Sequence, residues 1–201
     1  MANDLIENRV ALEAARLRYD NPEEFREYYQ AKREAAKRFN VDILPSNKLI
    51  YQYYQDIADT KEGKEQRQQR LRKMREEALE WLEDFEKYGF DCWVIGSVQR
   101  GDVTLKSDID IQVFAEEDPT DFLEALDENG VEYDHEIKTV KKDGERKDYF
   151  HVYLKKEFDC EVSVYVKGKH EPQTCSIFGV KIIGWKRKQL LKELKGEGNN
   201  S

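Results

Sequence analysis

The sequence predicts an α+β fold in which helices come first and a mixed β-sheet follows. Apolar residues recur at three- and four-residue steps through residues 4–88, as they do in amphipathic helices. After Gly89, short apolar runs bounded by turn residues replace this pattern, as is typical of strands. A chain of 201 residues has room for one domain, or for a core with a helical appendage.

Start and stop signals locate the helices of the first part of the chain. Asn21 is expected to cap a helix that has Pro22 at its first position, and Gly89 is expected to end the helix before it. The expected helices cover about 4–19, 22–39, 47–60 and 64–88.

The remaining elements follow from alternation and turn chemistry. Asp118 and Pro119 begin a short helix, Lys142 to Glu145 reads as a hairpin turn, and a last helix lies around Leu190. The expected strands cover 90–95, 109–114, 136–140, 149–154 and 160–166. We therefore expect a helical extension over 1–62, a sheet-bearing domain over 63–195 and a disordered polar tail over 196–201.

The composition is that of a soluble protein, with 38% charged residues, 39% hydrophobic residues and a net charge of −8. Residues 137–201 are basic, with 15 Lys and Arg against 9 Asp and Glu, and the rest of the chain is acidic. An acidic chain is a poor general binder of nucleic acid, because neutralisation of phosphates drives that affinity. The widely spaced Cys92, Cys160 and Cys175 favour free thiols over a disulfide framework or zinc site. We expect a cytoplasmic protein without a membrane span or secretory signal.

A glycine and a serine follow the first expected strand directly. Gly96 stands where the backbone must turn sharply, and Ser97 is expected to cap a short helix that follows. The exposed amides of such a turn attract anions. This pattern indicates a phosphate-binding turn, although a Gly-Ser pair after a strand is common.

Two aspartates open the next expected strand. Because side chains alternate along a strand, Asp108 and Asp110 share one face with Gln112, while Ile109 and Ile111 take the other. Two carboxylates on one face repel each other unless a cation lies between them, and aspartate is depleted in strands. Their spacing of about 6–7 Å along the strand allows both to approach one Mg²⁺ or to bracket two ions.

A third carboxylate is expected from the last strand. Glu161 lies inside that strand between apolar neighbours, where a charged side chain is uncommon, whereas Asp159 stands at the start of the strand. Both have the parity of the polar face. We favour Glu161, with Asp159 and the exposed polar face of an edge strand as the alternatives.

Together these residues resemble the nucleotidyltransferase fold of the DNA polymerase β superfamily. The spacing of Gly-Ser, ten residues and Asp-x-Asp is similar to that of its short minimal members. Arg100, Gly101 and Ser107 also match residues that those members often carry. The resemblance covers roughly residues 80–170, and it maps the third carboxylate to Glu161. It implies a polymerase β-type mixed sheet packed with helices, and it identifies 63–195 as the nucleotidyltransferase domain.

The resemblance implies a Mg²⁺-dependent enzyme, with Mn²⁺ as an alternative metal. Asp108, Asp110 and Glu161 would be the catalytic metal ligands, and Gly96 and Ser97 would bind the β- and γ-phosphates of a nucleoside triphosphate (NTP), with ATP expected. The product would be a nucleoside monophosphate joined to a hydroxyl, with pyrophosphate released.

Three further residues are candidates with alternatives. Arg100 and Lys106 either contact phosphate or are surface charges. His151 shares a strand face with Tyr149 and Tyr153 and is either a structural histidine or a contact to base or ribose. The motifs do not identify the acceptor of the nucleoside monophosphate; we favour a protein over a small molecule or an RNA end. A homo-oligomer is compatible with the helical extension, and the alternative function is an inactive nucleotide-binding or protein-interaction module.

Overall fold

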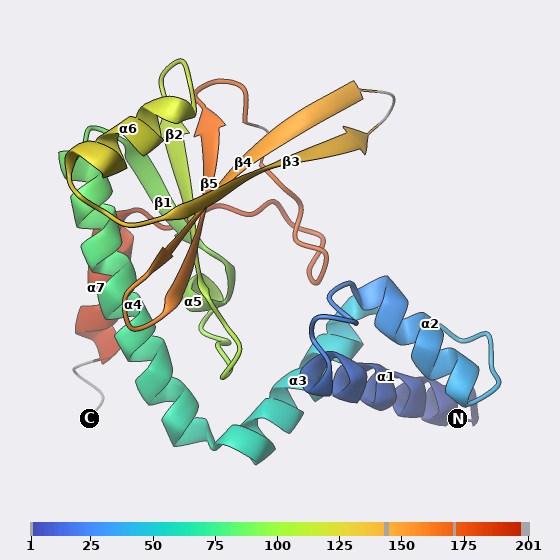
Figure 1. Ribbon diagram of the computed structural model, residues 1–201. Helices are drawn as coiled ribbons and strands as arrows, with labels where there is room; N and C mark the ends of the chain where they lie inside the picture. The colour runs from blue at the N-terminus through green and yellow to red at the C-terminus, as the bar shows by residue number, and fades with distance from the viewer. Residues whose placement is uncertain (1, 143–144, 171, 198–201) are drawn as a thin grey trace. The chain divides into compact units, whose positions relative to one another are not determined.

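The computed structural model describes residues 2–142, 145–170 and 172–197 and confirms the predicted α+β class. None of the helices in these ranges has both the length and the apolarity needed to cross a membrane. The elements in chain order (Figure 1) are α1 (Ala2–Asp20), α2 (Tyr28–Arg38), α3 (Asn47–Glu62), α4 (Lys64–Lys87), β1 (Asp91–Ile95), α5 (Gly96–Arg100), β2 (Ile109–Ala115), α6 (Thr120–Glu128), β3 (Asp134–Lys142), β4 (Glu145–Lys155), β5 (Asp159–Val166) and α7 (Arg187–Glu197).

The chain forms two compact units. One unit comprises Met1–Arg67 together with Thr174–Lys181, and the other comprises Gln68–Gln173 together with Ile182–Ser201. Helix α7 continues to Glu197, into the predicted tail, and 198–201 lie outside the described residues, as does the hairpin turn at 143–144. The predicted division into domains after 62 and 195 stays a prediction.

The second unit contains a mixed sheet of five strands in the order β1-β2-β5-β4-β3. Strands β2 and β5 are parallel, and the other three neighbouring pairs are antiparallel. The segment after β5 returns to the free edge of β1, where Trp185 and Val94 exchange backbone hydrogen bonds of 2.8 and 2.9 Å. The central parallel pair therefore joins segments that are about fifty residues apart in the chain.

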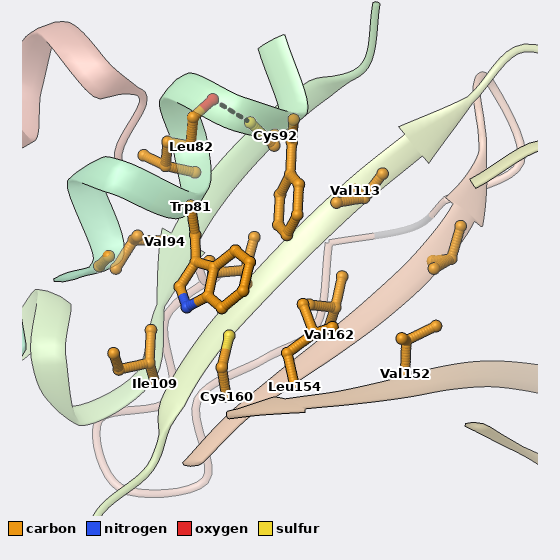
Figure 2. Packing of buried hydrophobic residues seen from close by; sticks show 14 of the residues in the cluster. Trp81, Leu82, Cys92, Val94, Ile109, Val113, Val152, Leu154, Cys160 and Val162 are labelled. Carbon is orange, nitrogen blue, oxygen red and sulfur yellow. Dashed lines mark hydrogen bonds between the residues drawn. The ribbon is translucent and has the colours of Figure 1, made fainter. Parts of the chain in front are cut away.

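Helices α4 and α6 cover one face of this sheet, and their apolar residues form one core with the strands. Figure 2 shows Trp81 and Leu82 of α4 facing Val94, Val113 and Val162. The Cys92 thiol lies 3.6 Å from the Leu82 carbonyl oxygen in the same core. Burial chiefly raises the pKa of Cys92 to about 12, so this thiol stays neutral and packs as an apolar group.

The first unit is a helical cluster in which α1 packs against α2 and α3. The predicted helix start at 21–22 is wrong, because residues 22–25 form a separate turn before α2 begins. The Arg18 guanidinium donates hydrogen bonds of 3.0 and 2.6 Å to the carbonyls of Phe25 and Arg26. Phe25 is also buried in the cluster. These tertiary contacts hold the turn apart from α2 and outweigh the local capping signal.

Candidate active site

Strand β1 ends at the predicted phosphate-binding turn. Gly96 has a φ of +72°, a conformation that favours glycine. Ile95 pairs with Asp110 across the β1–β2 ladder, and a Cβ atom on Gly96 would overlap the Asp110 carboxylate. Asp110 and the turn therefore meet, because the absence of a side chain at Gly96 leaves room for the Asp110 carboxylate.

The predicted capping role of Ser97 is wrong. Helix α5 begins at Gly96, its N-cap is Ile95, and no side chain caps it. Ser97 instead lies inside α5, where its carbonyl oxygen accepts hydrogen bonds of 2.8 and 3.1 Å from the amides of Gly101 and Asp102. The Ser97 carbonyl thereby holds the loop that leads to β2, and contact of its hydroxyl with phosphate stays a prediction.

The structure brings the candidate carboxylates to one part of the sheet. Asp110 and Glu161 are direct partners in the parallel β2–β5 ladder, where neighbouring strands lie about 4.8 Å apart. Asp108, one residue before β2, lines an open cleft of about 530 Å³ together with Glu161. Burial chiefly raises the pKa of Cys160 behind them, and the negative charges of Asp110 and Asp108 contribute.

The three carboxylates are neighbours but not a preformed metal cluster. Within the described ranges, no group of three or more His, Cys, Asp or Glu side chains is arranged to hold a metal ion. The Glu161 side chain is directed to His151, whose Nδ1 lies 2.7 Å from Glu161 Oε1. The ligand roles of Asp108, Asp110 and Glu161 therefore remain predictions.

Glu161 and Asp159 differ sharply in their surroundings. The Glu161 side chain is 18% exposed and lies beside Asp110 in register. The Asp159 side chain is 73% exposed and forms an ion pair of 2.8 Å with Lys155. Of the two alternatives for the third carboxylate, only Glu161 has an aspartate of β2 as its ladder partner.

The two predicted phosphate-contacting cations lie in or next to the loop between α5 and β2. Arg100 forms an ion pair with the buried Asp102, with 2.9 Å between Nε and Oδ2. Lys106 is exposed in a turn that Ser107 closes, because the Ser107 hydroxyl accepts a hydrogen bond of 2.9 Å from the Thr104 amide. Ser107 thus has a structural role, and contact of Arg100 or Lys106 with a phosphate stays a prediction.

Sequence reasoning missed the support that α4 gives to α5. Arg75 is 5% exposed, and its guanidinium donates to the carbonyls of Val98 and Gln99 at 3.1 and 3.4 Å. It also lies 5.3 Å from the centre of the Trp185 ring. A cation at the last carbonyls of a helix stabilises that end, so Arg75 helps to hold the turn that begins at Gly96. A charged residue within the apolar pattern of α4 was the one available signal.

Polar side chains continue from Glu161 across β4 and β3. Tyr153 is the ladder partner of Glu161, and its hydroxyl accepts a hydrogen bond of 2.9 Å from Lys138 and donates one of 3.2 Å to Glu136. The bond to Tyr153 chiefly raises the pKa of Lys138, and the charge of Glu161 contributes. Lys138 belongs to no sequence motif. Only the pairing of the strands shows that its positive charge lies beside the carboxylates.

Comparisons with known proteins bear on the same part of the chain. The nucleotidyltransferase domain family matches residues 71–191. No curated protein matches the chain.

Solved structures that match include Cid1 in complex with its short product ApU, at 18% identity over 47% of this chain and 31% of that chain, with a TM-score of 0.32. Cid1 poly(U) polymerase bound to MgGTP matches at 16% identity over 47% and 32%, also with a TM-score of 0.32. A cytoplasmic RNA terminal U-transferase matches at 21% identity over 46% and 28%, with the same TM-score. The chain thus covers about a third of the length of these proteins.

Proposed function

We propose that this chain, which belongs to the nucleotidyltransferase domain family, transfers a nucleoside monophosphate from an NTP to a hydroxyl acceptor and releases pyrophosphate. The family match confirms the resemblance to polymerase β-type nucleotidyltransferases and supports nucleotidyl transfer in general. ATP as the donor, the divalent metal and the kind of acceptor are parts of the proposal.

One observation carries the proposal: the turn at Gly96, Asp110 and Glu161 are side by side although they come from three separate strands or strand ends. Gly96 leaves space that a Cβ atom would take from the Asp110 carboxylate. An anion-binding turn and a cation-binding carboxylate pair are both needed to hold a triphosphate and its metal. A polar sheet face with a purely structural role has no need for this combination.

The donor set fits a hard divalent cation, because carboxylate oxygens are the ligands that Mg²⁺ prefers. Asp108, Asp110 and Glu161 would hold Mg²⁺, or Mn²⁺ in its place. Bound there, the metal would neutralise charge on the triphosphate and lower the pKa of the acceptor hydroxyl. The residues themselves act by positioning: the amides that follow Gly96 bind phosphate oxygens, and the fixed loop keeps Asp108 at the start of β2.

The electrostatics of the cleft favour a protein or small-molecule hydroxyl over an RNA end as acceptor. Glu132, Asp134 and Asp159 line the cleft in addition to Asp108 and Glu161, and Lys155, which also lines it, forms an ion pair with Asp159. Even with divalent cations bound at the proposed ligands, Glu132 and Asp134 leave the outer cleft with net negative charge, which repels the phosphates of a polyanion. A protein acceptor remains our first choice, and residues 1–62 are proposed as the module that binds it or mediates dimerisation.

The test is transfer of label from each α-labelled NTP with Mg²⁺ in host lysate, followed by separation of protein, RNA and small molecules. We expect label in protein with the wild type, and its loss in Asp108→Ala/Asp110→Ala. The pair Glu161→Gln and Asp159→Asn is a matched control, because each change removes one carboxylate charge from β5. We expect Glu161→Gln alone to reduce transfer by more than the roughly 100-fold typical of groups outside the ligand shell.

The outcomes separate the proposal from its alternative. Nucleotide binding that depends on Mg²⁺, measured by titration calorimetry, without pyrophosphate release on any acceptor would favour an inactive nucleotide-binding module. Equal loss of transfer in Asp159→Asn and Glu161→Gln would contradict the choice of Glu161. Label in RNA alone would overturn the proposed acceptor class but not the transfer reaction.

A further inference from the structure

His151 and Glu161 form a close side-chain contact next to the proposed metal site. His151 Nδ1 lies 2.7 Å from Glu161 Oε1, and the two side chains are 14% and 18% exposed. A carboxylate accepts hydrogen bonds only, so Nδ1 carries the proton and donates it in this contact. The Ser163 hydroxyl lies 3.4 Å from the same nitrogen, which is too long for it to compete strongly.

Strand order explains why these two residues meet. His151 pairs with Ser163 and Tyr153 pairs with Glu161 in the antiparallel β4–β5 ladder, so His151 is a diagonal neighbour of Glu161. Diagonal neighbours on one face are within reach of long side chains. Glu161 therefore lies between Asp110 of β2 on one side and β4, which carries His151, on the other.

We propose that His151 is a positioning residue for Glu161: its Nδ1–H binds one carboxylate oxygen and leaves the other to serve as the metal ligand. Groups that hydrogen-bond a ligating carboxylate fix its orientation and tune its affinity for the metal. This inference rests on the proposed function, because it takes Glu161 as the third carboxylate. It gives His151 a role distinct from the structural histidine and from the base contact that its strand face suggests.

The test is Mn²⁺ binding to the full chain, measured by electron paramagnetic resonance and titration calorimetry without nucleotide. We expect His151→Ala to weaken Mn²⁺ binding by about 10–100-fold. We expect His151→Asn to restore much of it, because the Asn amide nitrogen corresponds to Nδ1, and His151→Gln to restore little, because its amide corresponds to Nε2. His135→Asn is the matched control, since His135 stacks on Phe150 in the same sheet and is expected to leave Mn²⁺ binding unchanged.

A double-mutant cycle separates positioning from a merely structural contact. In a Glu161→Gln background, His151→Ala should have no further effect on Mn²⁺ affinity, because the residue through which it acts is changed. If His151→Ala fails to fold, as judged by thermal unfolding, the Asn and Gln variants make the same comparison between the two ring nitrogens. Equal Mn²⁺ affinity of these two variants, or additive losses in the cycle, would overturn the inference.

The same titrations distinguish this inference from the proposed function. Wild-type Mn²⁺ binding that is lost in Asp110→Asn but unchanged in His151→Ala would overturn the inference and leave the proposed function intact. Wild-type protein that binds no Mn²⁺, with or without ATP, would overturn both.

Discussion

The two faces of strand β2 have different surroundings although they belong to the same seven residues. On one face, Ile109, Ile111 and Val113 are buried in the core with α4 and α6. On the other face, Gln112 and Phe114 are also buried, and Asp110 stays partly exposed beside Gly96 and Glu161. The buried residues of both faces stabilise the strand, so its partly exposed position at Asp110 can keep a charged group beside others that repel it. Variants of the core residues should change stability, and variants around Asp110 should change activity.

The largest expected effect is at Gly96 on the carboxylate face. Gly96→Ala places a Cβ atom onto the Asp110 carboxylate and an alanine at a φ of +72°. Because a displacement of about 1 Å at a reacting site can cost 100-fold, we expect nucleotidyl transfer to fall by about that factor or more. The measurement is the initial rate of pyrophosphate release at saturating NTP.

Gly89→Ala is the matched control for backbone strain. Gly89 has a φ of +96°, and a Cβ atom there would meet nothing within 4 Å. We expect this variant to lose about 1–2 kcal/mol of stability and to keep its activity. A similar loss of activity in both variants would show that strain, and not the Asp110 contact, explains the effect at Gly96.

The next effect is on the helix-covered face of the same strand. Ile111 is 1% exposed, so Ile111→Ala leaves a cavity and should lower the free energy of unfolding by about 2–5 kcal/mol. Urea unfolding measures this loss, and NTP binding by the folded variant should stay close to wild type. Ser163→Ala, on the carboxylate face of β5, should cost less than about 1 kcal/mol. Equal losses in the two variants would contradict the division between the faces.

The smallest effect concerns Glu77, a carboxylate on the helix-covered side. Glu77 is 7% exposed and accepts hydrogen bonds of 3.1 and 3.3 Å from the amides of Glu157 and Phe158. Burial chiefly raises its pKa above the usual 4.5, although these bonds lower it. A raised pKa means that the folded state binds the proton more tightly. The stabilisation from protonation is therefore full below the unfolded pKa and is lost as pH rises through the folded pKa.

Glu77→Gln removes this titration, so its stability relative to wild type should increase as the pH rises from about 4 to 7. Urea unfolding at several pH values in this range measures the difference. Glu77→Ala, which also removes the acceptor of two backbone amides, should be less stable at every pH by about 1–3 kcal/mol. If the difference in the free energy of unfolding between Glu77→Gln and wild type does not change with pH, the prediction is contradicted.

Local patterns predicted most of the fold. Gly89 lies two residues after the end of α4 with a φ of +96°, as predicted for the residue that ends this helix, because caps depend on a few adjacent residues. The helix start at 21–22 and the capping role of Ser97 were wrong. At 22–25 the turn is held by Arg18 from another helix, a contact that no local pattern reports.

The candidate site was predictable in its parts but not in its arrangement. The alternation around Asp108 and Asp110 predicted a shared polar face, and the period of β5 put Glu161 on the same kind of face. The contact of Gly96 with Asp110 and the approach of His151 to Glu161 had no sequence signal, and for the Arg75 bonds to α5 the only signal was a charged residue within the apolar pattern of α4. Each of them depends on which strands and helices become neighbours.

The periods, the turn at Gly96 and the spacing of the aspartates could all be predicted from the sequence, because they depend on backbone sterics and on side chains a few residues apart. The position of β5 between β2 and β4, in contrast, depends on how the whole sheet assembles. That order makes Glu161 the neighbour of Asp110 and brings His151 within 2.7 Å of it. Strand order follows from burying the apolar faces of α4, α6, β1, β2, β4 and β5 in one core, and that is a property of the whole unit.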